Sequence, residues 1–314
     1  MDPGHFFASS RVLVVAGKGG VGKTVTAATI AAAASRCGLS VLLVEVAGRS
    51  AAAPMFGAST QGYEEAVLVH EAERNGIRHG EIRGKSITPD DALTEWLSSH
   101  GFNRLLKRMA KSGILEVVAT ATPGIKDLLV LGRIKALESE GAADLIVVDA
   151  PAAGHALGFL RSPTGVRDAA RTGTIHRQAV EVLELISDPE RLQLILVTIP
   201  EETPINELIE TSYAVEDEVG VKLGPVVVNG VLPEIDGLEG STTRAQASTH
   251  ERTDLNEAAA FRASRTALQN EQLERLGTEL PLPQIQISQV FGTQIGPAEI
   301  DVLAGEFIAG IEAL

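Results

Sequence analysis

One segment near the start of the chain constrains its fold more than any other. Residues 17–24 read Gly-Lys-Gly-Gly-Val-Gly-Lys-Thr, which satisfies the pattern G-x-x-x-x-G-K-S/T. A short apolar, β-branched run at residues 12–16 precedes the segment, and an alanine-rich run at residues 24–35 follows it. The first run predicts a strand buried on both faces, and the second predicts a helix packed closely on a sheet. A strand, a glycine-rich loop and a helix in this order indicate a phosphate-binding loop, although a glycine-rich turn that matches by accident is the alternative.

Each residue type in the loop has a chemical task in holding a nucleotide. Glycines let backbone N–H groups turn toward an anion, and the following helix offers its positive N-terminal end. The Lys23 ammonium is placed to neutralise the terminal phosphates, and the Thr24 hydroxyl to ligate Mg²⁺. We therefore predict ATP and Mg²⁺ as cofactors. The predicted nucleotide contacts are Gly17, Lys18, Gly19, Gly20, Val21, Gly22, Lys23, Thr24 and Val25.

Further short apolar runs recur along the chain with helical patterns between most of them. We read them as strands at residues 41–46, 145–148, 192–197, 226–228 and 285–287. Strands that alternate with helices predict an α/β fold with a doubly wound, mostly parallel sheet covered on both faces. No internal repeat is visible, so we expect a single domain over residues 1–314.

Two regions interrupt the alternation. Residues 68–82 read as a pair of strands with a turn at Asn75-Gly76, and residues 90–138 read as mostly helical, broken at Pro123-Gly124. We predict a helical insertion at residues 84–140. Residues 232–257 are polar and rich in charge, which predicts a flexible surface loop.

Charge and composition exclude several function classes. The chain has 27 lysine and arginine residues against 41 aspartate and glutamate residues, a net charge of -14 that disfavours nucleic acid and anionic lipid as partners. One cysteine, Cys37, and no cysteine–histidine cluster argue against a structural zinc or an iron–sulfur cluster held within one chain. The first residues form no signal peptide and no apolar run reaches 18 residues, so we expect a cytoplasmic protein without stable membrane insertion. An apolar stripe near the end is predicted to pack on the domain; it comprises Ile300, Leu303, Phe307, Ile311 and Leu314.

A second chemical motif follows the predicted strand at residues 145–148. Asp149 stands at the carboxyl tip of that strand, where ligands lie in open α/β sheets and where an aspartate holds Mg²⁺, usually through water. We therefore predict Asp149 and Thr24 as the metal-binding residues. A strand-end cap is the alternative for Asp149.

These motifs together resemble one family. The loop with its extra Lys18 is similar to the "deviant Walker A" branch of P-loop ATPases. The stretch from Asp149 through Gly154-His155 to Phe159-Leu160 resembles the D-T-A-P-T-G-H-T-L-R-F-L switch of the arsenite-pump ATPase family, which includes the eukaryotic tail-anchored-protein targeting ATPase. The resemblance implies a dimer in which Lys18 reaches the partner's nucleotide and stabilises the transferred phosphoryl group; the alternative is a solvated loop lysine.

The same resemblance implies a base contact. By the family pattern Asn229 would hydrogen-bond the adenine edge, and the alternative is an asparagine that ends a strand at the turn with Gly230. His155 is read as structural. The catalytic candidates are then Lys18, Lys23 and Asp149, together with Glu45.

The sequence departs from the family after the second predicted strand. The family carries S-T-D-P-A-H there, with an aspartate that positions the attacking water, and the gap-free alignment puts Ala47 at that position. A methyl group cannot orient water or accept a proton. Glu45 lies two residues earlier, on the same face of an extended strand, so it is a candidate substitute; a structural or Mg²⁺-shell role is the preferred reading. The V-E-V-x-G form resembles a bacterial "anion-transporting ATPase" subgroup often encoded as unequal pairs, which implies a homodimer or a heterodimer with a paralogous ATPase.

The resulting expectation is a Mg²⁺-dependent dimeric ATPase whose nucleotide state is coupled to conformational change and whose hydrolysis is slow or partner-dependent. A non-hydrolysing regulatory pseudo-ATPase subunit is the alternative, and a small-molecule kinase or ligase is a third reading. One cysteine cannot build a three-cysteine arsenite site, so arsenite transport is disfavoured. The sequence does not identify a client.

Overall fold

A computed structural model of the chain describes residues 1–46, 50–59, 62–74, 76–99, 124–151, 153–233, 235 and 249–314. Within these residues the main sheet has the strand order β11-β10-β8-β1-β7-β2-β6-β3, and β9 pairs with β8. All neighbouring strands are parallel except β3, which runs antiparallel to β6. The strands are β1 (Val12–Gly17), β2 (Val41–Val46), β3 (Ala66–Val69), β6 (Ile82–Ile87), β7 (Leu145–Asp149), β8 (Leu192–Thr198), β9 (Lys222–Leu223), β10 (Val226–Val231) and β11 (Gln284–Ser288). A separate hairpin pairs β4 (Ala72–Arg74) with β5 (Ile77–His79).

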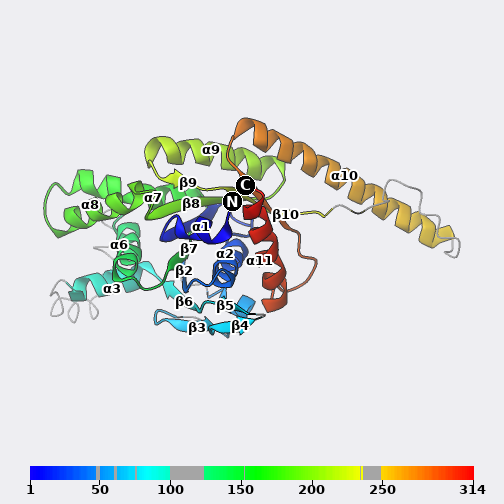
Figure 1. Cartoon of the computed structure of the whole chain (residues 1–314). Coiled ribbons are helices and arrows are strands. Elements are labelled where there is room, and N and C mark those ends of the chain that lie inside the picture. The colour runs from blue at the N-terminus through cyan, green and yellow to red at the C-terminus, as the bar shows by residue number, and fades with distance from the viewer. Residues whose placement is uncertain are drawn as a thin grey trace.

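Helices cover both faces of the sheet, because every central strand is apolar on both sides (Figure 1). In β1, Val12 and Val14 point into one core and Leu13 and Val15 into the other. One face is covered by α1 (Pro3–Ala8), α2 (Lys23–Arg36) and α11 (Pro297–Glu312). The other is covered by α3 (Pro89–Ser99), α6 (Ile125–Glu140), α7 (Ala153–Ala169), α8 (Thr174–Ser187) and α9 (Glu202–Glu218).

These elements confirm the predicted α/β class and the mostly parallel sheet. Each of the six predicted strands is present, and the alanine-rich run forms α2. Alanine is the right residue there because α2 lies against the sheet along most of its length; its alanines at 27, 28, 31, 33 and 34 are buried.

The predicted helical insertion at residues 84–140 is wrong at its start. Residues 84–87 belong to β6, which pairs with β2 inside the main sheet. The helix α6 is part of the core, since Leu128, Leu131 and Ile134 are fully buried beside α7 and α8. Residues 100–123, including Pro123, lie outside the described residues. The alternating strand pattern was hidden in β6 because Arg83, Lys85 and Ser86 interrupt its apolar residues.

The predicted loop at residues 232–257 is wrong from residue 249 onward. Residues Thr249–Glu279 form the 31-residue helix α10, which packs its later turns on α9 and extends its earlier turns away from the body (Figure 1). Residues 249–257 mix Glu, Arg and Leu with weaker helix formers, but they run directly into Ala258-Ala259-Ala260, and the segment has no proline and no glycine before Gly277. Helix propensity therefore prevails over the polar composition.

The end of the chain packs as predicted. Ile300, Leu303, Phe307 and Ile311 of α11 are buried, and the Phe307 ring stacks with Phe7 of α1. Leu314, the last residue of the predicted stripe, lies beyond the helix and is exposed, so the prediction is wrong for this residue. Among the described residues no helix is both long and apolar enough to span a membrane.

Candidate functional site

The candidate site is built where the carboxyl ends of four strands meet. The loop after β1, Glu45 in β2, Asp149 at the end of β7 and Asn229 in β10 all lie at this edge of the sheet. Strand order alone brings them together, because β1 lies between β7 and β8. This is the edge at which open α/β sheets bind ligands.

The glycines of the loop are required by its geometry. Gly20 and Gly22 have φ of +91° and +88°, a left-handed conformation that disfavours any side chain, and Gly22 is the N-cap of α2. A Cβ added to Gly17 would lie 2.3 Å from the Val197 carbonyl oxygen of β8. A Cβ added to Gly22 would lie 2.1 Å from Nδ2 of Asn229. The loop is therefore shaped by the two strands next to it as well as by its own sequence.

Asn229 braces the loop in this structure. Its Nδ2 donates a hydrogen bond to the Val21 carbonyl oxygen at 2.8 Å. By the family pattern Asn229 would hydrogen-bond the adenine edge, and that role stays a prediction. The structure adds the contact with Val21, which ties β10 to the loop.

Three polar groups converge at the start of α2. Lys23 Nζ donates to the Lys18 carbonyl oxygen at 3.0 Å, and Thr24 Oγ1 donates to Asp149 Oδ2 at 2.6 Å. The other carboxylate oxygen, Asp149 Oδ1, is buried without a hydrogen-bond partner among the described residues. A buried carboxylate oxygen without a donor beside a threonine hydroxyl is the oxygen set that suits Mg²⁺. The residues present therefore fit the predicted metal.

Burial disfavours the charged forms of Asp149 and Lys23. It raises the pKa of the Asp149 carboxyl, while the Thr24 hydrogen bond and the Lys23 ammonium lower it by less. Burial likewise lowers the pKa of Lys23, and the charge of Asp149 raises it by less. Both charged forms are thus disfavoured without a further charged ligand, which is typical of a functional site.

The raised pKa of Asp149 predicts an effect on stability. Because the folded state binds this proton more readily than the unfolded state, the contribution of Asp149 to stability falls as pH rises from its unfolded pKa toward its folded one. We expect Asp149→Asn to stabilise the nucleotide-free chain at pH 7 by about 0.5–2 kcal/mol, with a smaller gain near pH 4. Urea unfolding at the two pH values measures this difference.

Asp144, at the other end of the same strand region, is the matched control. Hydrogen bonds from the Ser40 hydroxyl and backbone N–H lower the pKa of Asp144, so its stabilisation is present at neutral pH and is lost as pH falls through its folded pKa. Asp144→Asn should therefore destabilise the chain at pH 7. If Asp149→Asn is also less stable than wild type at pH 7, burial does not disfavour the charged form of Asp149 as we infer.

Glu45 is buried next to Asp149. The two residues are paired in register on neighbouring strands, and Glu45 is only 3% exposed. Its Oε1 accepts hydrogen bonds from the backbone N–H groups of Ala51 at 2.8 Å and Ala52 at 3.2 Å. Burial raises the pKa of Glu45, these two N–H groups lower it, and the charge of Asp149 raises it. Glu45 therefore holds the segment that follows β2; Ala47 lies outside the described residues.

Sequence reasoning missed Glu207, the partner of Lys18. The Lys18 ammonium forms an ion pair with Glu207 in α9, and each side chain is 39% exposed. No local pattern marks Glu207, because its place beside the loop depends on β8 pairing with β1. Within a single chain the Lys18 ammonium is therefore paired with a carboxylate of the same chain.

Sequence reasoning also missed a pocket beside Asn229. It has a volume of about 590 Å³ and is formed by the end of β8, the start of α9, the ends of β10 and β11 and the middle of α10. Arg265 pairs with Glu201 at 2.9 Å, and the Arg262 guanidinium lies 5.6 Å from the centre of the Phe291 ring. The lining residues are Ile199, Pro200, Glu201, Glu202, Thr203, Pro204, Gly230, Leu232, Phe261, Arg262, Arg265, Leu268, Gln269, Gln272, Gln289 and Phe291.

A family model described as anion-transporting ATPase matches residues 10–176, more than half of the chain. The chain belongs to the anion-transporting ATPase family. The matched residues include the loop, Glu45 and Asp149, and they end before Glu207, Asn229 and α10. The contacts of Glu207, Asn229 and α10 described above therefore come from the structure and not from the family match.

Individual relatives agree with this family. The ATPase BagA of Mycobacterium tuberculosis is 32% identical over 232 residues, which cover 71% of this chain and 66% of the relative. A Halobacterium salinarum protein named as an arsenical pump-driving ATPase is 26% identical over 72% of this chain and 36% of the relative. The ATPase get3 of Schizosaccharomyces japonicus is 29% identical over 51% of this chain and 46% of the relative. The chain thus spans slightly less than two thirds of its mycobacterial relative.

Proposed function

We propose that this anion-transporting ATPase family member binds ATP with Mg²⁺ at the loop and hydrolyses the nucleotide as one half of a dimer. The observation that carries the proposal is the convergence of Lys23, Thr24 and the unpartnered Oδ1 of Asp149 where β1 and β7 end. Lys23 then exchanges the Lys18 carbonyl oxygen for phosphate oxygens, and Thr24 and Asp149 hold the metal ion. Mg²⁺, when bound, neutralises charge on the phosphate oxygens.

The pocket beside Asn229 is the proposed site of the nucleoside. Its lining includes Gly230, the residue after Asn229, and the Asn229 amide donates a hydrogen bond to the Val21 carbonyl oxygen of the loop. Its mixture of apolar side chains with a few amides and charges is typical of small-molecule sites. Because α9 and α10 both line it, a bound nucleoside couples the sheet to the helices that lie outside it.

Lys18 is proposed to act on the nucleotide of the partner subunit. In the single chain Glu207 holds its ammonium, but a half-exposed ion pair contributes little and is readily exchanged. A neighbouring subunit's phosphates offer more negative charge than one carboxylate. Glu207 is therefore proposed as the group that holds Lys18 until the dimer forms.

Slow or partner-dependent turnover follows from the segment after β2. Glu45 Oε1 is engaged by two backbone N–H groups, so that oxygen positions residues 50–52. Ala47, at the family's aspartate position, offers no group to orient water. We propose Glu45 as a positioning residue. We expect either the partner subunit to supply the group that orients the attacking water, or hydrolysis to proceed slowly without such a group.

Mixing two inactive variants tests the dimer. Lys23→Ala removes the chain's own phosphate contact but keeps Lys18, whereas Lys18→Ala keeps the nucleotide site but removes the residue that acts in trans. Each variant alone should be inactive, and their equimolar mixture should recover up to about a quarter of wild-type turnover, because half of the dimers are mixed and each has one working site. Steady-state ATPase assays with the mass determined in the same buffer measure this.

The controls separate the alternatives. A mixture of Lys18→Ala with a Lys18→Ala/Lys23→Ala double variant supplies no lysine in trans and should stay inactive. Recovery in the control, or full activity of Lys18→Ala alone, would overturn the trans role. If the wild-type chain binds ATP without turnover and Ala47→Asp restores turnover, the chain is instead the regulatory pseudo-ATPase. The alanine at position 47 is the observation that favours this alternative.

A further inference from the structure

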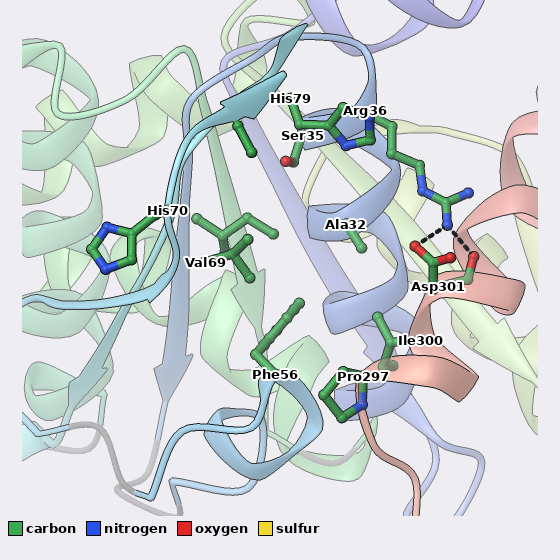
Figure 2. A pocket seen from close by; sticks show the side chains of 12 residues that line it. Ala32, Ser35, Arg36, Phe56, Val69, His70, His79, Pro297, Ile300 and Asp301 are labelled. Carbon is green, nitrogen blue, oxygen red and sulfur yellow. Dashed lines mark hydrogen bonds and ion pairs between the residues drawn. The ribbon is translucent and has the colours of Figure 1, made fainter. Parts of the chain in front are cut away.

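A second cavity lies between α2, β3, β6 and α11 (Figure 2). The short 3₁₀ helix η1 (Ala53–Phe56) closes one side of it. Its volume is about 110 Å³. The lining residues are Ala32, Ser35, Arg36, Phe56, Val69, His70, Ala72, His79, Ile82, Pro297, Ile300 and Asp301.

The two ends of this cavity differ chemically. Figure 2 shows Phe56, Val69 and Pro297 around one end, and Arg36 and His79 at the other. The His70 ring points away from the cavity, on the far side of its strand (Figure 2). The cavity is therefore apolar at one end and polar at the other.

The whole cavity has about the size of a single ring. A cavity of about 150 Å³ lined by aliphatic and aromatic side chains stays dry and binds benzene, so about 110 Å³ with one open side accommodates a benzene ring or a branched chain of similar bulk. Ala32 contributes only a methyl group to this wall, which leaves the space open.

The polar end offers hydrogen-bond donors. The Arg36 guanidinium binds the Asp301 side chain and the Asp301 carbonyl oxygen through one nitrogen, Nη2, and a guanidinium carries five N–H donors. Among the described lining residues Asp301 is the one acidic side chain and Arg36 the one basic side chain, and His79 adds a ring nitrogen at this end. Arg36, His79 and Asp301 also line an open groove of about 690 Å³ that continues toward α1, so a ligand can enter from this end.

One wall of the cavity is connected to the nucleotide site. Phe56 ends η1, and η1 begins directly after Ala52, whose N–H is held by Glu45. Ala52 and Ala53 are fully buried, and Gly57, with φ of +78°, turns the chain beside Pro297 of α11. A group that fills the cavity against Phe56 therefore presses on the same segment that Glu45 positions beside Asp149.

We propose that this cavity binds a small carboxylic acid with a single aromatic ring or a branched apolar chain, and that its occupancy is coupled to the nucleotide site through η1. The apolar body fills the end at Phe56, and the carboxylate binds Arg36 at the open end. Coupling is reciprocal: a nucleotide that shifts residues 50–52 must change the affinity for the acid by the same factor.

Phenylacetate is the probe, and calorimetry or NMR titration of the full chain gives its Kd. Without nucleotide, we expect saturable one-to-one binding with a roughly millimolar Kd. Ala32→Leu fills the cavity and should weaken binding about tenfold or more, whereas Ala263→Leu, which adds the same atoms on an exposed part of α10, should leave it unchanged. Benzylamine, with the same ring and a cationic head, should bind about tenfold more weakly. Melting temperatures show that each variant is folded.

The nucleotide analogue AMP-PNP with Mg²⁺ tests the coupling. It should change the phenylacetate Kd by about fivefold or more. An equal Kd with and without the bound analogue would overturn the coupling. Absence of saturable binding, or equal binding by wild type and Ala32→Leu, would overturn the site. The titrations without nucleotide are independent of ATP binding, so a failure of this proposal is distinguishable from a failure of the ATPase proposal.

Discussion

Lys23→Ala should lower ATP turnover by about a hundredfold to a thousandfold while leaving the fold intact. Lys23 is the ammonium placed at the loop, and a donor aimed at transferred charge contributes about a hundredfold to a thousandfold in rate. In the nucleotide-free chain the Lys23 ammonium donates a hydrogen bond to the Lys18 carbonyl oxygen, and burial lowers the pKa of Lys23. Removing it therefore costs little in the absence of nucleotide.

Thermal unfolding separates the two effects. ATP with Mg²⁺ at about 100 times its Kd should stabilise the wild-type chain by about 2.7 kcal/mol, and this gain should vanish in Lys23→Ala at the same concentration. Lys222→Ala, which removes an exposed lysine of β9, is the control and should keep both turnover and the nucleotide-dependent shift. Retention of the shift in Lys23→Ala would contradict the assignment of the loop as the phosphate site.

The parts of the fold that the sequence predicts well are those fixed by local patterns. The six buried strands are short β-branched runs, and the helix α2 is an alanine-rich run that only close packing explains. Their local periodicity does not depend on the rest of the chain. Asp149 was predicted at a strand tip for the same reason, and it lies there.

The parts that the sequence does not predict depend on which strands become neighbours. Glu207 reaches Lys18 and Asn229 reaches Val21 only because β8 lies between β1 and β10. Several strand orders satisfy the same alternation of strands and helices, so no spacing in the chain indicates these contacts. The error at α10 has a different cause, since its charged composition was read as a loop although its residues favour a helix.

The contact between the loop and β10 predicts the second large effect. Gly22→Ala should destabilise the chain by about 2–4 kcal/mol and weaken nucleotide binding. An alanine at φ +88° costs about 1–2 kcal/mol, and its Cβ would lie 2.1 Å from Asn229 Nδ2, so the amide must move and release the Val21 carbonyl oxygen. Denaturant unfolding measures the loss.

Gly20→Ala is the matched control within the same loop. Gly20 has nearly the same φ, +91°, but a Cβ there would meet no atom within 4 Å, so this variant reports backbone strain alone. The difference between the two variants is the cost of displacing Asn229. Asn229→Ala removes the obstacle, so adding it to Gly22→Ala should recover part of that difference, with a coupling energy of about 1 kcal/mol or more in the double-mutant cycle. Equal losses at Gly20 and Gly22 would show that β10 does not shape the loop, and the proposed path from the nucleoside pocket to the phosphate site would lose its physical link.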